Sequence, residues 1–283
     1  MAKRIMLDAG HYGKYNRSPH VEEYYESQRM WVLCRLLQMQ LEKKGYIVHT
    51  TRDDQSKDLA VIDRGKKAKG YDMFISLHSN DFDGSENLTT ANKIDYVVAY
   101  VPSYAKNDRC KNSQKVGLKF TKYISGVIGA KQEPRTDTKL KSNGDEYYGV
   151  LRGWQKVSCP VGFIIEHGFH SNPKTAKWLL DDENLLNLAS GEANIIDSYF
   201  KGEIEEKEEP KVEAPKEIKV GSIVKIRSGA YMYGTTKKLA SWVYPLEWVV
   251  LQVKGERVVV DKSADGKHSI ETPIDIDDLT LTR

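Results

Sequence analysis

The sequence has 283 residues, and 43 Lys and Arg against 40 Asp and Glu leave a formal net charge of +3. Hydrophobic residues make up 40% of the chain, enough for a packed core, and the nearly balanced charge gives no basic face of the kind that binds nucleic acid. No apolar run reaches the roughly 20 residues of a membrane-spanning helix, so membrane insertion is not expected. Three distant cysteines, Cys34, Cys110 and Cys159, argue against a disulfide framework and against a paired-cysteine zinc site.

Strand-like and helix-like segments alternate from residue 3 to residue 200. Five apolar runs predict strands: KRIMLDA (3–9), YIVHTT (46–51), YDMFISLH (71–78), IDYVVAYV (94–101) and PVGFIIEHG (160–168). Apolar residues at helical spacing predict helices over 25–44, 59–69, 107–128 and 173–200, the last with a break near Glu183. This alternation predicts an α/β domain, with a mainly parallel twisted sheet flanked by helices, over residues 1–200.

The composition changes sharply after this domain. Residues 201–219 contain seven Glu, five Lys, two Pro and no aromatic residue. A solvated helix is one interpretation, because Glu and Lys favour helices, but the two interior prolines favour an extended linker over 201–217. Short β-rich runs separated by glycine-containing turns follow, and they predict a small all-β barrel over residues 218–283.

Several residues able to bind a metal fall at the ends of the predicted strands. His11 follows the first strand, His78 closes the third, and Glu166 lies near the end of the last. Ligands of open α/β sheets bind beyond the carboxyl ends of the strands, so we expect these side chains to share one edge. The helix that begins nearby adds carboxylates at Glu22, Glu23 and Glu26. Two histidines and a glutamate form a catalytic zinc shell, although a single such histidine is more commonly structural.

Five motifs in the same order make the sequence similar to a known family. They are DAGH (8–11), a glutamate 19 residues before Gly45, TRDD (51–54), FISLHSN (74–80) and IIEHGFHSN (164–172). Over residues 4–200 the chain resembles the zinc-dependent N-acetylmuramoyl-L-alanine amidases of the Amidase_3 type. The resemblance implies zinc ligands at His11, Glu26 and His78, with Glu23 as the second choice for the glutamate. It implies that Glu166 is the catalytic carboxylate.

The implied reaction is hydrolysis of the amide bond between the lactyl group of N-acetylmuramic acid and L-alanine in peptidoglycan. Zinc would lower the pKa of a water molecule, and Glu166 would act as its general base. Tyr147 and Tyr148 are candidates for the substrate groove, and burial in the core is the equal alternative. His167 and His170 are expected beside the site without binding the metal.

Two arginines are interpreted as loop anchors. We expect Arg52 and Arg64 to pair with the nearby Asp54 and Asp63. A direct catalytic role is not expected for either arginine.

The C-terminal segment resembles bacterial SH3-like domains that bind cell walls. It is rich in aromatic residues for its size, and we expect Trp248 in its core. Tyr231, Tyr233 and Trp242 are predicted to be more exposed and to contact the wall.

The combination predicts a modular peptidoglycan hydrolase, with a phage endolysin as the first hypothesis. The first residues reach Asp8 too soon for the apolar stretch of a signal peptide, so we expect the chain to stay in the host bacterial cytoplasm until it is released to the wall. A bacterial autolysin, a zinc peptidase that cuts the stem peptide and a non-catalytic wall-binding protein are the alternatives. The target wall and the oligomeric state stay open.

Overall fold

The computed structural model describes residues 2–103, 108–203, 218–235 and 237–282. The chain divides into two compact units, Met1–Glu205 and Glu206–Arg283, and each is described by itself. Most of the predicted linker, and the predicted start of the third long helix, lie outside the described residues.

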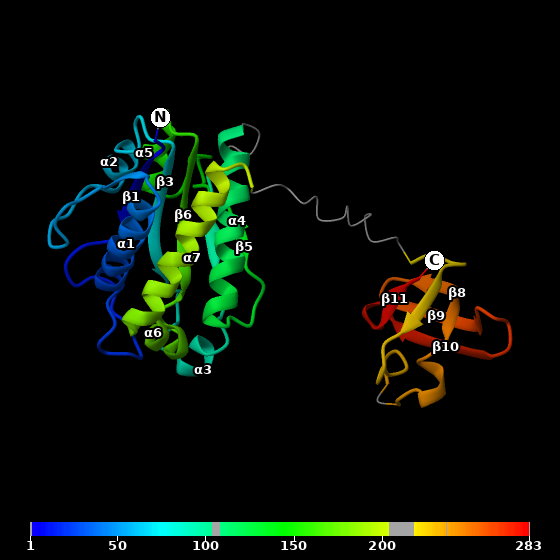
Figure 1. Cartoon of the computed structure of the whole chain (residues 1–283). Helices are drawn as coiled ribbons and strands as arrows, with labels where there is room; N and C mark the ends of the chain where they lie inside the picture. The colour runs from blue at the N-terminus through cyan, green and yellow to red at the C-terminus, as the bar shows by residue number, and fades with distance from the viewer. Residues whose placement is uncertain (1, 104–107, 204–217, 236, 283) are drawn as a thin grey trace. The chain divides into compact units, whose positions relative to one another are not determined.

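The first unit is built on a six-stranded sheet in the order β2-β1-β3-β6-β4-β5 (Figure 1). Its strands are β1 (Arg4–Ala9), β2 (Ile47–Thr50), β3 (Met73–Asn80), β4 (Val98–Tyr100), β5 (Arg135–Asp137) and β6 (Val161–Phe169). β2, β1, β3 and β6 are mutually parallel, whereas β4 pairs antiparallel with β6 and β5 follows the direction of β4. The mainly parallel sheet predicted from the sequence is confirmed, and its β4–β5 edge makes it mixed.

Helices cover both faces of this sheet. One face carries α1 (Glu26–Lys43), α4 (Asp108–Ile128), α6 (Pro173–Leu180) and α7 (Asp182–Phe200). The other face carries α2 (Val61–Lys66) and α5 (Gly149–Gln155), and α3 (Leu88–Ala91) is a short turn of helix. The break predicted near Glu183 lies at Asp181, whose carboxylate accepts hydrogen bonds from the Glu183 and Asn184 backbone N–H groups and so caps α7.

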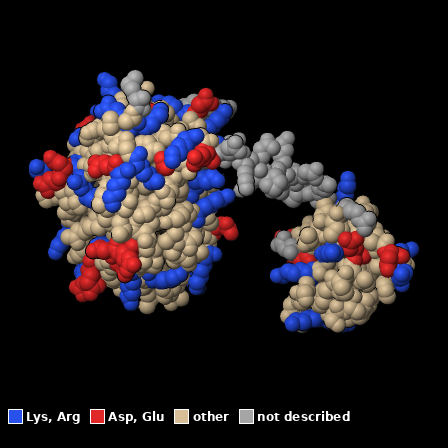
Figure 2. Space-filling model, in the orientation of Figure 1, with Lys and Arg blue, Asp and Glu red and all other residues tan. Residues whose placement is uncertain are grey.

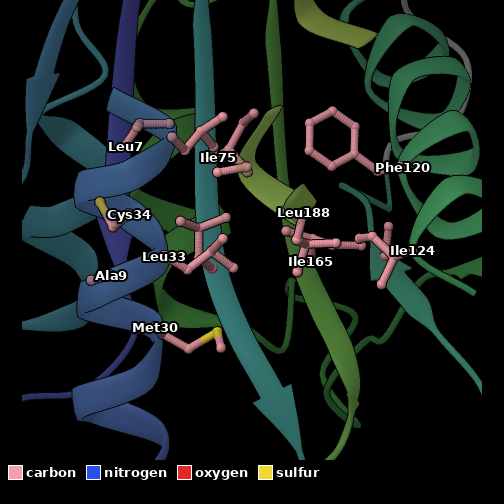
Figure 3. Close-up of a cluster of buried hydrophobic side chains, with 14 of the residues drawn as sticks. Leu7, Ala9, Met30, Leu33, Cys34, Ile75, Phe120, Ile124, Ile165 and Leu188 are labelled. Atoms are coloured by element: carbon pink, nitrogen blue, oxygen red, sulfur yellow. The ribbon is translucent and has the colours of Figure 1, made fainter. Parts of the chain in front are cut away.

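The larger core lies between the sheet and the helices α1, α4 and α7 (Figure 3). Its fully buried side chains include Leu7, Ile75, Ile165, Leu33, Phe120 and Leu188. Successive side chains of a strand point to opposite faces of the sheet. Asp8 follows the core residue Leu7, and Glu166 follows the core residue Ile165, so both carboxylates face the side that carries α2 and α5. The polar residues of the central strands therefore gather beneath the two shorter helices.

The helices α2 and α5 pack unusually closely. A Cβ atom at Gly65 would lie 1.9 Å from the Val150 carbonyl oxygen, and one at Gly153 would lie 2.0 Å from the Ile62 carbonyl oxygen. Neither position has room for a side chain, so the two glycines allow backbone-to-backbone contact. The helix predicted over 59–69 corresponds to the shorter α2, and α5 was not predicted.

The second unit contains a five-stranded antiparallel sheet in the order β10-β9-β8-β7-β11. Its elements are β7 (Ile223–Ile226), β8 (Glu247–Lys254), β9 (Arg257–Ser263), β10 (Ser269–Asp275), β11 (Leu279–Leu281) and the 3-10 helices η1 (Ser241–Val243) and η2 (Ile276–Asp278). Trp248 is fully buried in the core of this sheet, as predicted, and its indole N–H donates to the Val243 carbonyl oxygen.

The surfaces of both units carry mixed charge. Figure 2 shows Lys and Arg interspersed with Asp and Glu over the face in view. Within the part of the chain that the structure describes, no helix combines the length and the apolar character needed to cross a bilayer.

Candidate metal centre and active site

The candidate site lies where β1, β3 and β6 end, on the face covered by α2 and α5. His78 in β3 pairs directly with Glu166 in β6, and His11 comes just after β1. The ring centroids of His11 and His78 are 5.1 Å apart. Gly10 makes this approach possible, because a Cβ atom there would lie 2.5 Å from the His78 ring.

Glu26, the first residue of α1, reaches between the two histidines. Its Oε1 atom lies 2.8 Å from His78 Nδ1, and its Oε2 atom lies 3.4 Å from His11 Nε2. One potential ligand atom from each of these residues lies within 4.8 Å of the other two. Glu22 and Glu23 are exposed and lie outside this group, and Glu22 forms an ion pair with Arg17.

This donor set fits a zinc ion. Two imidazoles and one carboxylate are the protein ligands of many catalytic zinc sites, which keep another position open. Neighbouring ligands of a tetrahedral zinc ion are about 3.3 Å apart when the metal–ligand bonds are about 2.0–2.1 Å long. Glu26 approaches each imidazole with a different oxygen atom, at 2.8 Å and 3.4 Å, and both distances are close to this spacing.

Burial and mutual charge set the ionisation of this group when no metal is bound. Burial alone would raise the pKa of Glu26, but the hydrogen bond and charge of His78 lower it to about 2. Burial works against the charge on His78, yet the hydrogen bond and charge of Glu26 raise its pKa to about 9. Burial lowers the pKa of His11 to about 4, against the attraction of Glu26. At neutral pH the group therefore holds an ionised Glu26, a protonated His78 and a neutral His11.

Glu166 is suited to move a proton beside this group. Its side chain lines the same cavity, and its Oε2 atom is buried without a hydrogen-bond partner among the described residues. Burial raises the pKa of this carboxyl group to about 7, with Glu26 adding to the effect and His78 opposing it. A carboxyl group with a pKa near neutrality can both accept and return a proton at neutral pH.

Two arginines hold the backbone in front of His11. Arg52 and Arg64 both donate to the Ala9 carbonyl oxygen, and Arg64 also donates to the Leu59 carbonyl oxygen and pairs with Asp58. His11 itself has a φ of 54°, a left-handed conformation that needs such support in a residue other than glycine.

The predicted partners of these arginines were wrong. Asp54 pairs with Lys57, and Asp63 pairs with Lys66. The loop-anchoring role is correct, but it is exerted on backbone carbonyl groups that tertiary folding brings within reach.

The two additional histidines lie behind the site, outside the metal-binding group. His167 is fully buried, with Nδ1 2.9 Å from the His78 carbonyl oxygen and Nε2 2.7 Å from a carboxylate oxygen of Glu192. His170 is buried as well, with Nδ1 2.9 Å from the Ser79 carbonyl oxygen. Both therefore contact the backbone of β3 at or next to His78.

A cavity of about 510 Å³ opens over the site. It is lined by Asp8, His11, Tyr12, Tyr15, Asp58, Val61, Arg64, His78, Tyr148, Gly149, Val150, Ile164 and Glu166. Of the two tyrosines predicted for the groove, Tyr148 lines the cavity, whereas Tyr147 is exposed beside it. Tyr12 and Tyr15 were not predicted to line the cavity, although Tyr12 directly follows the predicted ligand His11 in the sequence.

Asn16 is a further residue that the sequence reasoning missed. Its Nδ2 atom lies 2.7 Å from Glu26 Oε2 and 3.0 Å from His11 Nε2, inside the metal-binding group. The residue has a φ of 52°, which asparagine tolerates better than most residues. The signal in the sequence was an asparagine, a possible ligand, in the loop that precedes α1 and its first residue Glu26.

Comparison with known proteins places this geometry in a family. Residues 5–198 match the family model described as N-acetylmuramoyl-L-alanine amidase. A search of curated proteins finds no significant match.

Solved structures share the fold of the first unit. Cwp6 from Clostridium difficile is 22% identical with a TM-score of 0.59, and the match covers 70% of this chain but only 29% of Cwp6. The N-acetylmuramoyl-L-alanine amidase from Clostridium difficile 630 is 20% identical with a TM-score of 0.56, covering 71% of this chain and 97% of that one. The catalytic domain of CwlV from Bacillus (Paenibacillus) polymyxa is 20% identical with a TM-score of 0.55, covering 70% and 98%. Since the family model spans most of the sequence and the fold agrees with it, the chain belongs to the N-acetylmuramoyl-L-alanine amidase family.

Proposed function

We propose that the first unit is a zinc-dependent enzyme that cleaves the amide bond between N-acetylmuramic acid and L-alanine in peptidoglycan. The observation that carries the proposal is the convergence of His11, Glu26 and His78 beside Glu166, whose Oε2 atom is buried with no hydrogen-bond partner among the described residues, in a chain of the amidase family. The cavity above them has room for the muramoyl–alanine junction, because ligand pockets begin at about 300 Å³.

His11, Glu26 and His78 would hold the zinc ion. When bound, zinc supplies a Lewis acid that polarises a carbonyl group and lowers the pKa of water. Glu166 takes a proton from the attacking water at its free Oε2 atom and returns it to the departing alanine nitrogen. Arg52 and Arg64 keep His11 in place through the Ala9 carbonyl oxygen.

The cavity walls would orient the substrate. Tyr12 and Tyr15 lie on the side of His11, and Tyr148 stands with Val150 among the other lining residues. Their rings offer flat apolar surfaces for a pyranose ring and for the alanine methyl group. Tyr147, exposed at the edge, would contact the more distant part of the stem peptide or glycan.

Digestion of purified peptidoglycan followed by mass spectrometry tests the activity. An amidase releases stem peptides with free L-alanine amino termini and leaves the glycan intact, and a chelator should abolish the release. New termini inside the stem peptide would instead identify a zinc peptidase. An unchanged wall would indicate a protein that only binds it.

We propose that the second unit is an SH3-like wall-binding domain. Its five-stranded antiparallel sheet and small apolar core are compatible with such a domain. Tyr231 and Trp242 are exposed, whereas Tyr233 is half-buried, so the first two are the stronger candidates for wall contact. Co-sedimentation of the full chain with walls tests this: Trp242→Ala should lower binding severalfold, and Leu251→Ala, which changes another exposed apolar residue of this unit, should not.

We propose a phage endolysin as the biological role, with a bacterial autolysin as the alternative. A catalytic unit followed by a β unit, with a charged segment rich in Glu and Lys near their boundary, is compatible with an enzyme that is tethered to its wall target. In this role the chain would stay in the host cytoplasm until a second protein opens the membrane. Production of the chain inside a susceptible bacterium should cause lysis only when a second protein permeabilises the membrane, whereas lysis without that protein would favour the autolysin.

A further inference from the structure

Asn16 occupies a position that the proposed reaction does not yet explain. Its side-chain amide contacts Glu26 Oε2 at 2.7 Å and His11 Nε2 at 3.0 Å. These two atoms are themselves 3.4 Å apart. The Asn16 amide, Glu26 Oε2 and His11 Nε2 therefore form a triangle of potential donor atoms around the place where a cation would be held.

The backbone fixes this position independently of the side chain. The Glu26 N–H group donates to the Asn16 carbonyl oxygen at 2.9 Å, and the neighbouring Tyr15 N–H group donates to the Ser27 hydroxyl at 2.8 Å. Gln55 holds the same loop from the other side by donating to the Gly13 carbonyl oxygen. Asn16 is therefore tied to the first turn of α1, the turn that presents Glu26.

The contacts that Asn16 makes compete with a cation. Its NH₂ group donates hydrogen to lone pairs of Glu26 and His11, and those lone pairs are the ones that metal coordination requires. An NH₂ group that faces a cation is repelled. A half-turn about the last side-chain bond exchanges the nitrogen with the carbonyl oxygen at nearly the same place, and oxygen is a ligand atom.

We propose that Asn16 is a fourth protein ligand of the metal, with its amide oxygen turned toward the cation. The distances of 2.7 and 3.0 Å from the amide to the other two donor atoms agree with a shared coordination shell, in which neighbouring ligands lie about 3 Å apart. Some catalytic zinc sites expand to five ligands, and in such a shell one position stays open beside four protein ligands. The inference rests on the proposed metal-dependent function, and it adds a residue to that site.

Zinc affinity and the visible spectrum of the Co²⁺ form of the full chain test the proposal without a measurement of activity. Asn16→Gly removes the amide and tolerates the φ of 52°. It should weaken zinc binding about tenfold or more in competition with a chromophoric chelator, and it should change the Co²⁺ spectrum. Asn16→Asp keeps an oxygen at the same place and should bind zinc at least as tightly as the parent.

Gln55→Ala is the matched control, because it loosens the same loop without touching the metal-binding group. It should leave both zinc affinity and the Co²⁺ spectrum unchanged. Asn16 is not a ligand if Asn16→Gly binds zinc as tightly as the parent or more tightly, or if Gln55→Ala weakens binding equally. A parent chain that binds no zinc would instead overturn the proposed function, and this inference with it.

Discussion

Glu166 combines burial with a free oxygen atom, and this combination determines what the side chain can do. The carboxyl group has no hydrogen-bond partner at Oε2 among the described residues, and burial raises its pKa to about 7. We expect Glu166→Gln to fold and to bind zinc normally but to lose activity about 10²–10⁴-fold, because the amide cannot take a proton. The release of muropeptides and the zinc content of the purified variant measure both effects. Near-parental release would show that another group moves the proton.

The ionisation of the metal-free group predicts how zinc binding depends on pH. His78 has a pKa of about 9 and His11 one of about 4, so between these values one proton must leave His78 before it can bind a metal. Zinc affinity should therefore rise about tenfold per pH unit between about pH 6 and pH 8. Titration calorimetry in buffers with different ionisation enthalpies should report the release of about one proton per zinc at pH 7. Affinity independent of pH would contradict the protonated state assigned to His78.

The sequence identifies the three candidate metal ligands, but it does not identify the residues that contact and position them. His11, Glu26 and His78 stand at strand and helix ends within recognisable motifs, and the structure brings them within 4.8 Å. Asn16 contacts them from a left-handed backbone conformation, and Arg64 donates to a carbonyl group distant in the sequence. Both contacts depend on tertiary folding, so the residue type alone does not predict them.

At the scale of elements, the glycines between α2 and α5 control the wall of the cavity. Val61 and Arg64 line it from α2, and Val150 lines it from α5. Gly65→Ala should force the helices apart and lower the free energy of unfolding of this unit by about 1–3 kcal/mol, since the added methyl group meets backbone atoms. Calorimetry of the full chain measures the change.

Gly126→Ala is the control for that substitution. Gly126 lies in α4, and a methyl group added there would meet no atom of the described residues within 4 Å. Alanine at this position should therefore raise stability by about 0.5–1 kcal/mol through helix propensity. Equal effects of the two substitutions would mean that the close approach of α2 and α5 is not required.

The long helices could be predicted from their apolar spacing, whereas the short elements α5 and β5 were missed. α1 runs from Glu26 to Lys43, one residue inside each predicted end, because burial of one face imposes its apolar spacing. β5 has only three residues, all polar, so no apolar run marks it, whereas the equally short β4 lies within the apolar run 94–101. Because α5 was not predicted, Val150 was missed as a lining residue of the cavity, although Tyr148, just before this helix, was predicted for the groove.

For the whole molecule, the division into two units predicts that wall binding and chemistry can be separated. A chain that ends at Glu205 keeps the whole metal-binding group and the cavity. It should hydrolyse a soluble muramoyl peptide at the parental rate but clear intact walls about 10²-fold more slowly, because the effective concentration at the wall is lost. Parallel assays on the two substrates measure the difference, and equal losses on both would show that the second unit supports catalysis directly.

Residues on the two faces of β6 suggest how the turnover of this enzyme could be changed from the buried side of the sheet. Glu166 lines the cavity, and the adjacent His167 faces α7, where it contacts the buried Glu192. Because His167 also lies 2.9 Å from the His78 carbonyl oxygen, we expect a substitution at Glu192 to shift His78 on the other side of the sheet. Libraries of substitutions at the buried face of α7 could therefore be screened for altered turnover, and they would leave the exposed residues unchanged.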